Sequence, residues 1–160
     1  MVWAGVWSGG YIGPFFFAGN VNGESYLRLL RTKVVPALEA HGVLNTVFFQ
    51  HDGASPHHTA PVMDYLNSVF GERIIGRTSA ITWPTNSPDL TPPDFYLWSR
   101  INEQVQKKEP PNVRTLKDDI RNEFRTLTVN EIRRSVLNTQ KRMNQCIRRG
   151  GKQVGKGLKS

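Results

Sequence analysis

The chain has 160 residues and a formal net charge of +8, from 21 Lys and Arg against 13 Asp and Glu. Its length suits one domain with a sizeable core, and its 38% hydrophobic and 21% charged residues exclude a disordered or membrane-spanning protein by composition. A single cysteine, Cys146, excludes an internal disulfide and a cysteine-based zinc site, so we expect a reducing compartment. No secretory signal is visible at the start.

The positive charge is concentrated in the last third of the chain. Residues 1–100 hold 6 basic and 7 acidic residues, whereas residues 101–160 hold 15 basic and 6 acidic ones. A one-sided basic block indicates a polyanionic partner, most often a nucleic acid. The alternative interpretation is a basic helical tail that is merely solvated.

The first third of the chain predicts a hairpin followed by a helix. Segments 2–7 and 12–17 are rich in β-branched and aromatic residues and are separated by a Gly-Gly pair, which is typical of a β-hairpin. A helix is predicted to begin after Asn22, a suitable N-cap, and to end at residues 41–42. Pro36 lies inside it and is expected to kink it.

The middle of the chain alternates strands and helices. The apolar run 46–50 predicts a buried strand that delivers Asp52 at its carboxyl end, and residues 58–70 have helical periodicity. Residues 74–75 predict a further short strand, and residues 77–88 predict a loop. This order predicts an α/β fold with a mixed sheet.

The last 50 residues predict two helices. Thr115 and Thr128 each begin a capping box, and the Gly-Gly pair at 150–151 ends the second helix. The tail from Lys152 is expected to fray. The residues predicted to face inward on the second helix are Ile132, Val136, Met143 and Ile147.

Two segments carry acids at positions where chemistry can take place. Asp52 follows a buried strand and precedes Gly53, the position where open α/β sheets usually bind ligands. The structural alternative is an ordinary Asp-Gly turn, which forms for conformational reasons alone.

The second segment surrounds Asp94. Thr91 is a candidate N-cap, Pro92 suits the first helical position, and Leu90 with Phe95 can form a hydrophobic staple, so Asp94 could simply be a capping carboxylate. A carboxylate on the first turn of a helix also has a fixed direction, as a metal ligand requires. Phosphodiester chemistry uses hard cations held by two or three convergent carboxylates, which makes the two aspartates a candidate pair.

These segments resemble those of the mariner-type transposases, which are DDE/D enzymes with an RNase H-like catalytic domain. The resemblance covers roughly residues 2–151, and its most specific part is the Ser-Pro-Asp-Leu-x-Pro-x-Asp pattern. It rests on the segments Val2–Val6, Gly13–Phe17, His51–Ala54 with His57, Trp83-Pro84 and Ser87–Phe95.

The resemblance implies roles for individual residues. Asp52 matches the second acid of the catalytic triad and Asp94 the third, so both would bind Mg²⁺ or Mn²⁺, two ions in the intact parent protein. His57 matches a histidine of the motif and would support the metal site, while His51 and His58 are interpreted as structural or exposed. Asp89 is interpreted as a residue that structures the loop.

The first acid of the triad has no counterpart in the chain, because the family carries it on a strand upstream of the one at Val2. Glu24 and Asp64 do not fit a strand-borne ligand. That strand is central in an RNase H-like sheet, so the hairpin and the strand before Asp52 are expected to lose the partner between them. We therefore expect the chain alone to be inactive and unstable, to aggregate, or to rearrange.

The sequence thus predicts a carboxyl-terminal fragment of a mariner-like transposase. Its expected division is a partial RNase H-like domain over 1–109, a basic helical extension over 110–151 packed on it, and a frayed tail over 152–160. The expected setting is the nucleus, with DNA as partner, a possible homodimer in the intact parent, and no membrane. The residues predicted to contact DNA phosphates are Arg121, Arg125, Arg133, Arg134, Lys141 and Arg142.

Two alternatives belong to other functional classes. One is a non-enzymatic nucleic-acid-binding remnant that uses only the basic helices. The other is an unrelated metal hydrolase built from Asp52 and the histidines at 51, 57 and 58. The adjacent pair His57-His58 argues against the hydrolase, since side chains of neighbouring residues point apart.

Overall fold

The computed structural model describes residues 1–155 and forms two compact units. Unit 1 consists of Met1–Trp3 and Phe15–Asn86, and unit 2 consists of Ala4–Pro14 and Ser87–Ser160. Each unit is described by itself below. The division into 1–109, 110–151 and 152–160 stays a prediction.

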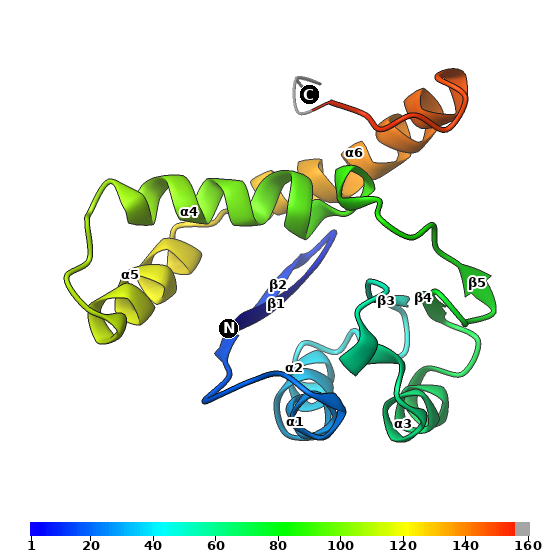
Figure 1. The fold of residues 1–160 in the computed structure, drawn as a ribbon, viewed down its shortest axis with the longest axis horizontal. Coiled ribbons are helices and arrows are strands. Elements are labelled where there is room, and N and C mark those ends of the chain that lie inside the picture. The colour runs from blue at the N-terminus through cyan, green and yellow to red at the C-terminus, as the bar shows by residue number, and fades with distance from the viewer. Residues whose placement is uncertain (156–160) are drawn as a thin grey trace. The chain divides into compact units, whose positions relative to one another are not determined.

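The chain begins with the predicted hairpin. Strands β1 (Val2–Trp7) and β2 (Gly10–Phe16) form a two-stranded sheet whose base belongs to unit 1 and whose tip belongs to unit 2 (Figure 1). A side chain at Gly9 would meet the Trp7 indole at 2.8 Å, so any other residue there would displace the indole.

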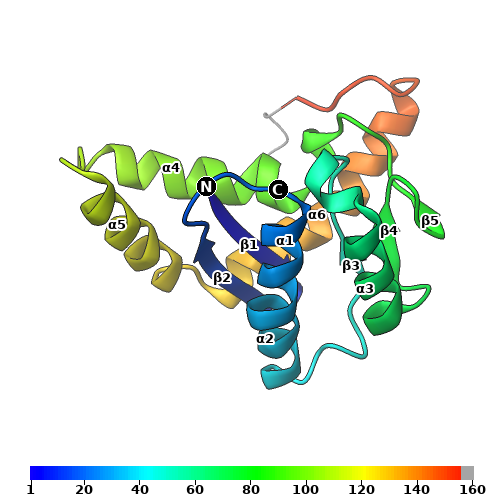
Figure 2. The ribbon, with the colours of Figure 1, turned by 60° about the horizontal axis from the view of Figure 1, so that its bottom comes forward.

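Unit 1 continues with a helical segment that changes its winding. Helix α1 (Gly23–Leu29) begins at the predicted N-cap, Asn22, in a capping box with Ser25. A π-helical turn, η1 (Leu30–Val34), then leads into α2 (Val35–Ala40), and the three follow one another along the chain (Figure 2). Pro36 lies in the first turn of α2, where its missing N–H is tolerated. The change of helical winding, from the π-helical turn to α2, comes just before the proline.

The sheet of unit 1 has three short parallel strands in the order β3-β4-β5. They are β3 (Phe49–Gln50), β4 (Ile74–Gly76) and β5 (Ile81–Thr82), with Phe49 opposite Ile74 and Ile75 opposite Ile81. Helix α3 (Ala60–Phe70) buries its apolar face and follows a 3₁₀ turn, η2 (Ser55–His58). The buried residues of α3 are Val62, Leu66 and Phe70.

Strand β3 is shorter than predicted. The guanidinium of Arg73 donates to the carbonyl oxygens of Leu44 and Val47, at 2.8 and 2.7 Å. Phe48 leaves 54% of its surface exposed. The apolar run 46–50 forms only two residues of strand, and the Val47 carbonyl group is bound by a side chain rather than by a neighbouring strand.

The hairpin and the three-stranded sheet share no strand pairing in the described part of the chain. The expectation that a partner strand is missing between the hairpin and the strand before Asp52 stays a prediction.

Unit 2 is mainly helical. A 3₁₀ turn, η3 (Pro88–Leu90), and a π-helical turn, η4 (Pro93–Leu97), lead into α4 (Trp98–Gln106), followed by α5 (Val113–Arg125) and α6 (Val129–Arg148). The core of this unit consists of Ala4, Leu97, Ile101, Val105, Phe124, Leu127 and Ile132.

The ends of the last two helices test the predicted caps. The capping box formed by Thr128 and Glu131 is present at the start of α6. At its end, Gly150 and Gly151 are both at positive φ, and their amides donate hydrogen bonds to the carbonyl oxygens of Ile147 and Cys146. Helix α5 begins earlier than predicted. Its N-cap is Asn112, whose side chain accepts from the Thr115 amide, so the prediction of a box opening at Thr115 is wrong.

The inward face of α6 also differs from the prediction. Ile132 is fully buried, but Ile147 is 75% exposed while Arg142 is only 3% exposed. Around the helix axis, Ile147 lies about 60° from Ile132 in one direction. Arg142 lies about 80° from Ile132 in the opposite direction, on the side where Ser135 is also buried.

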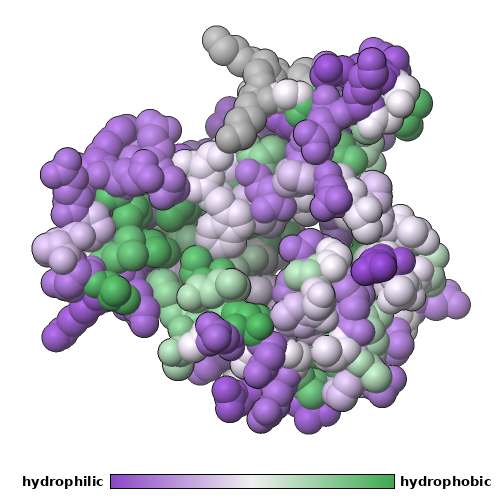
Figure 3. All heavy atoms as spheres, in the orientation of Figure 1, coloured by the Kyte–Doolittle hydropathy of each residue, from purple (hydrophilic) through white to green (hydrophobic). Residues whose placement is uncertain are grey.

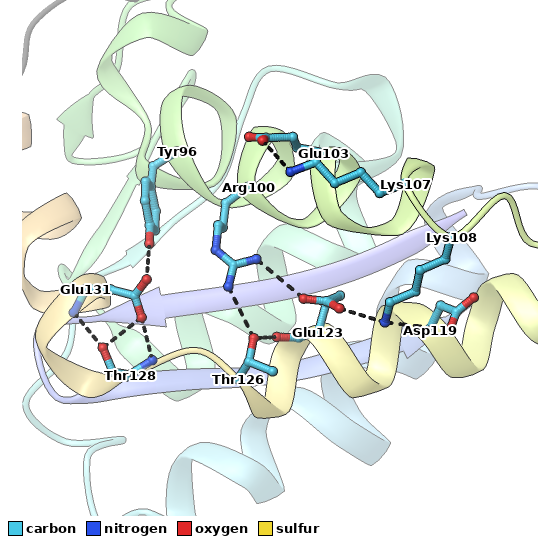
Figure 4. Close-up of polar contacts among 10 residues, drawn as sticks. All are labelled: Tyr96, Arg100, Glu103, Lys107, Lys108, Asp119, Glu123, Thr126, Thr128 and Glu131. Atoms are coloured by element: carbon cyan, nitrogen blue, oxygen red, sulfur yellow. Dashed lines mark hydrogen bonds and ion pairs between the residues drawn. The ribbon is translucent and has the colours of Figure 1, made fainter.

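A network of ion pairs joins α4 to α5 in unit 2 (Figure 4). Glu123, which is 8% exposed, pairs with Lys108 at 2.7 Å and with Arg100 at 3.4 Å. The Tyr96 hydroxyl donates to Glu131 at the start of α6, at 3.3 Å. In residues 1–155, no helix is long and apolar enough to cross a membrane.

Candidate functional site

Asp52 lies two residues beyond β3, as the sequence predicts. Its Oδ1 accepts hydrogen bonds from Nδ1–H of His57 at 2.6 Å and from the Ala54 amide at 3.1 Å. The backbone carbonyl of Asp52 accepts from Nε2 of His58 at 2.9 Å. The Asp52 side chain is nevertheless 68% exposed, so the carboxylate is held from one side and open on the other.

The hydrogen bond from His57 holds the pKa of Asp52 at about 2, well below its ordinary value; the Ala54 amide acts in the same direction, and partial burial opposes both. Asp52 is therefore ionised at neutral pH, which is the form that a hard divalent cation requires.

The imidazole of His57 is itself packed in place. Its ring centroid lies 4.1 Å from that of Tyr26, which is 1% exposed on α1. It also stacks on His51 at 5.7 Å, with 11° between the rings. The ring therefore holds the Asp52 carboxylate from one side, while the supporting role of His57 at a metal site stays a prediction.

His51 is a core residue. It is 7% exposed, and a side chain at Gly76 would meet its ring at 2.9 Å. Burial, with a smaller contribution from the neighbouring His57 and His58, lowers the pKa of His51 to about 4, so the ring is neutral at physiological pH. His51 is thus one of the structural histidines, as expected.

Asp94 lies in unit 2, in the first turn of η4. Its amide and that of Phe95 both donate to the Thr91 carbonyl oxygen, at 2.9 and 3.0 Å. The Thr91 hydroxyl donates to the Ser87 carbonyl instead of accepting from the helix, so the prediction that Thr91 caps with its side chain is wrong. These hydrogen bonds fix the backbone of Asp94 in the first turn of η4.

The loop before Asp94 is held by α6 and by the segment after it. The carbonyl oxygen of Asp89 accepts from Arg142 at 3.0 Å, and its carboxylate accepts from the Val154 amide at 2.7 Å. Asp89 therefore structures the loop, as expected. Val154 is 2% exposed, so the expected fraying does not reach it, and residues 156–160 of the predicted tail lie outside the described residues.

The two candidate metal ligands belong to different units, so their convergence on one ion stays a prediction. Asp52 fits a cation, because its carboxylate is ionised and accessible. In the described residues, no three His, Cys, Asp or Glu side chains gather to hold a metal ion.

Five of the six residues predicted to contact DNA are exposed, and Arg142 is the exception. The basic residues of α5 recur at three- and four-residue spacing and share one face; they are Arg114, Lys117, Arg121 and Arg125. On α6, Arg134, Lys141 and Arg148 recur every seven residues along another face. Figure 3 shows hydrophilic residues gathered over the carboxyl-terminal part of α6.

Sequence reasoning missed the burial of Arg142 and the packing of Tyr26 on His57. Arg142 occurs in a run of basic residues and looks like a surface residue. No local signal marks its burial, because its contacts Asp89 and Phe95 lie far away in the sequence.

No family model matches this chain. A curated protein, the transposable element Tc3 transposase of Caenorhabditis elegans, is 26% identical over 141 residues, which are 87% of this chain and 40% of that protein. The chain thus spans less than half the length of this relative.

Two solved structures share the fold. The Mos1 transposase catalytic domain with raltegravir and Mn has a TM-score of 0.79 and 20% identity, covering 96% of this chain and 78% of that one. The mariner Mos1 paired-end complex with Mg has a TM-score of 0.80 and 20% identity, covering 96% and 45%. The resemblance to mariner-like transposases and the predicted α/β, RNase H-like fold class are confirmed.

Proposed function

We propose that this chain is part of the catalytic domain of a mariner-like DNA transposase, in which Asp52 and Asp94 bind Mg²⁺ or Mn²⁺. The observation that carries the proposal is Asp52, an ionised and accessible carboxylate at the carboxyl end of β3. The likeness to the Tc3 and Mos1 transposases supports it, as does the structure of the latter with divalent metal.

The chemistry of the parent protein would be cleavage and transfer of DNA strands. Two divalent cations, when bound, stabilise the attacking and leaving oxygens of a phosphodiester. In this chain, His57 and the Ala54 amide keep Oδ1 of Asp52 ionised and fixed in direction. Two aspartates are fewer carboxylates than such sites usually hold, so the chain alone is expected to cleave no DNA.

Binding of Mn²⁺, followed by electron paramagnetic resonance, tests the metal site. We expect weak binding that Asp52→Asn and Asp94→Asn each reduce at least about fivefold, since each removes one charged ligand. Asp64→Asn is the matched control, because Asp64 is an exposed acid on α3 of unit 1. Binding that neither aspartate variant changes, or no binding at all, would contradict the assignment.

We further propose that the basic faces of α5 and α6 bind the phosphate backbone of DNA. The exposed cations supply charge without an arrangement that reads bases, which favours contacts to phosphates. Each phosphate contact steepens the plot of log K against log salt concentration by roughly 0.9. A salt titration with duplex DNA therefore measures the number of contacts, and a slope near zero would contradict this proposal.

A non-enzymatic nucleic-acid-binding protein is the second candidate. The exposed basic faces favour it, because they contain neither Asp52 nor Asp94, so contacts to DNA through them need neither candidate metal ligand. DNA binding that is unchanged by chelation of divalent metal, together with no Mn²⁺ site at Asp52 or Asp94, would select this function over the first.

The oligomeric state and location of the parent protein also belong to the proposal. We expect a homodimer on DNA and a nuclear protein. Light scattering of the parent protein on its DNA and microscopy of a tagged form would check the two expectations.

A further inference from the structure

Arg142 is buried on α6 against the segment that carries Asp94. It is 3% exposed, and its Nη1 donates to the Asp89 carbonyl oxygen at 3.0 Å. Its guanidinium carbon lies 4.2 Å from the centroid of the Phe95 ring, within the range of a cation–π contact. One side chain of α6 thus contacts this segment on both sides of Thr91.

Contacts from outside the segment hold it at Asp89. Neither η3 nor η4 has a side-chain cap, and the Thr91 hydroxyl bonds backward to Ser87. The bond between the Val154 amide and the Asp89 carboxylate is a second contact from beyond α6. Both external contacts converge on Asp89, five residues before Asp94.

The backbone links these contacts to Asp94. The Thr91 carbonyl accepts from the amides of Asp94 and Phe95, and the Phe95 ring lies under Arg142. We therefore expect a shift of Asp89 or of the Phe95 ring to move the backbone of Asp94 and, with it, the carboxylate. Groups that orient a metal ligand commonly affect the metal affinity of the site, although they do not touch the metal.

We propose that Arg142 is a positioning residue for Asp94 rather than a contact for DNA. Its guanidinium fixes residues 87–95 by binding the backbone at one end and an aromatic ring at the other. This inference rests on the proposed function only where it concerns the metal; the ordering of the segment stands without it.

Hydrogen exchange measured by mass spectrometry on the full chain tests the ordering. In Arg142→Met, we expect about tenfold faster exchange in residues 87–95, because the Asp89 carbonyl loses a buried partner. Arg142→Lys should recover part of the protection, since an ammonium can still donate but lacks the planar guanidinium. Lys141→Met, which removes the neighbouring exposed charge, should leave this segment unchanged.

Exchange that rises equally in α5 and in residues 87–95, with no partial recovery in Arg142→Lys, would mean that Arg142 only stabilises unit 2 and would overturn the proposal. If Arg142→Met fails to fold, Phe95→Leu provides the same test, because it removes the ring and leaves the hydrogen bond in place.

A double-mutant cycle on Mn²⁺ affinity tests the link to Asp94. We expect Arg142→Met to weaken Mn²⁺ binding about fivefold in the natural chain and not at all in Asp94→Asn. Equal weakening in both backgrounds would overturn the positioning role. If Asp94→Asn alone has no effect, the proposed function fails at Asp94, while the exchange experiment still decides whether Arg142 orders the segment.

Discussion

The two units differ in charge and in how they hold their candidate ligand. Unit 1 has five basic and five acidic residues, whereas unit 2 has 16 basic and eight acidic ones. In unit 1, Asp52 is fixed by side chains close in sequence, and the longest separation is the six residues to His58. In unit 2, the Asp94 segment is held by Arg142, 53 residues beyond Asp89. The candidate ligand of unit 1 is therefore held by local contacts, whereas the segment of the candidate ligand of unit 2 is held by a contact between residues far apart in the chain.

The largest expected effect is a loss of stability in one unit, which tests whether the two units unfold independently. Phe124 is 1% exposed in the core of unit 2, and Phe124→Ala should lower the free energy of unfolding of that unit by about 3–5 kcal/mol. Site-resolved hydrogen exchange in denaturant should show lower stability in α4–α6 and little change in α3. Equal loss in both units would show that they unfold as one.

The charge difference should appear in DNA binding. Changing Arg134, Lys141 and Arg148 to Gln should reduce the salt slope by roughly 2.7, the sum for three phosphate contacts. The matched control changes three exposed basic residues of unit 1, Arg28, Lys33 and Arg77, and should leave the slope unchanged. Equal effects of the two triple variants would mean that net charge, and not the face of α6, governs binding.

The two capping boxes allow a matched comparison of local stability. Asn22 caps α1 in unit 1 and Thr128 caps α6 in unit 2. In each box, the cap side chain accepts from the amide of the third helical residue, and the side chain of that residue accepts from the cap amide. Replacing either by Ala should cost about 1 kcal/mol, measured by chemical denaturation. A much larger loss at Thr128 would indicate that the Tyr96–Glu131 contact depends on the box.

The smallest expected effect is the titration of Asp52. Because its pKa is lowered to about 2 in the folded chain, its contribution to stability is present above the ordinary carboxyl pKa and is lost as the pH falls from about 4 to 2. The side chain is 68% exposed, so the contribution should stay below about 1 kcal/mol.

In His57→Ala the pKa of Asp52 should rise toward its ordinary value, because the main hydrogen-bond donor is lost. Carbon-13 NMR of the carboxyl group follows both titrations. A pKa that does not move in His57→Ala would show that the imidazole does not fix the carboxylate.

The features that sequence reasoning predicted are those set by neighbouring residues. The hairpin, the caps at Asn22 and Thr128, the stop at Gly150 and the position of Asp52 after a strand all follow from short-range patterns. The features that it missed depend on distant partners. Arg73 shortens β3 by binding carbonyl groups 26 and 29 residues away, and Arg142 is buried because of Asp89 and Phe95. The start of α5 was also missed, because the cap is Asn112, three residues before the predicted Thr115, and both residue types suit a helix start.

The most direct test of the central claim is cleavage of the polypeptide by hydroxyl radicals from Fe²⁺ bound in place of Mg²⁺. If Asp52 and Asp94 share one metal site, the chain should be cut near both residues 51–54 and residues 91–95, and Asp52→Asn or Asp94→Asn should abolish both cuts together. Cuts near only one aspartate, or cuts that persist in either variant, would show that the two carboxylates do not meet at a common ion.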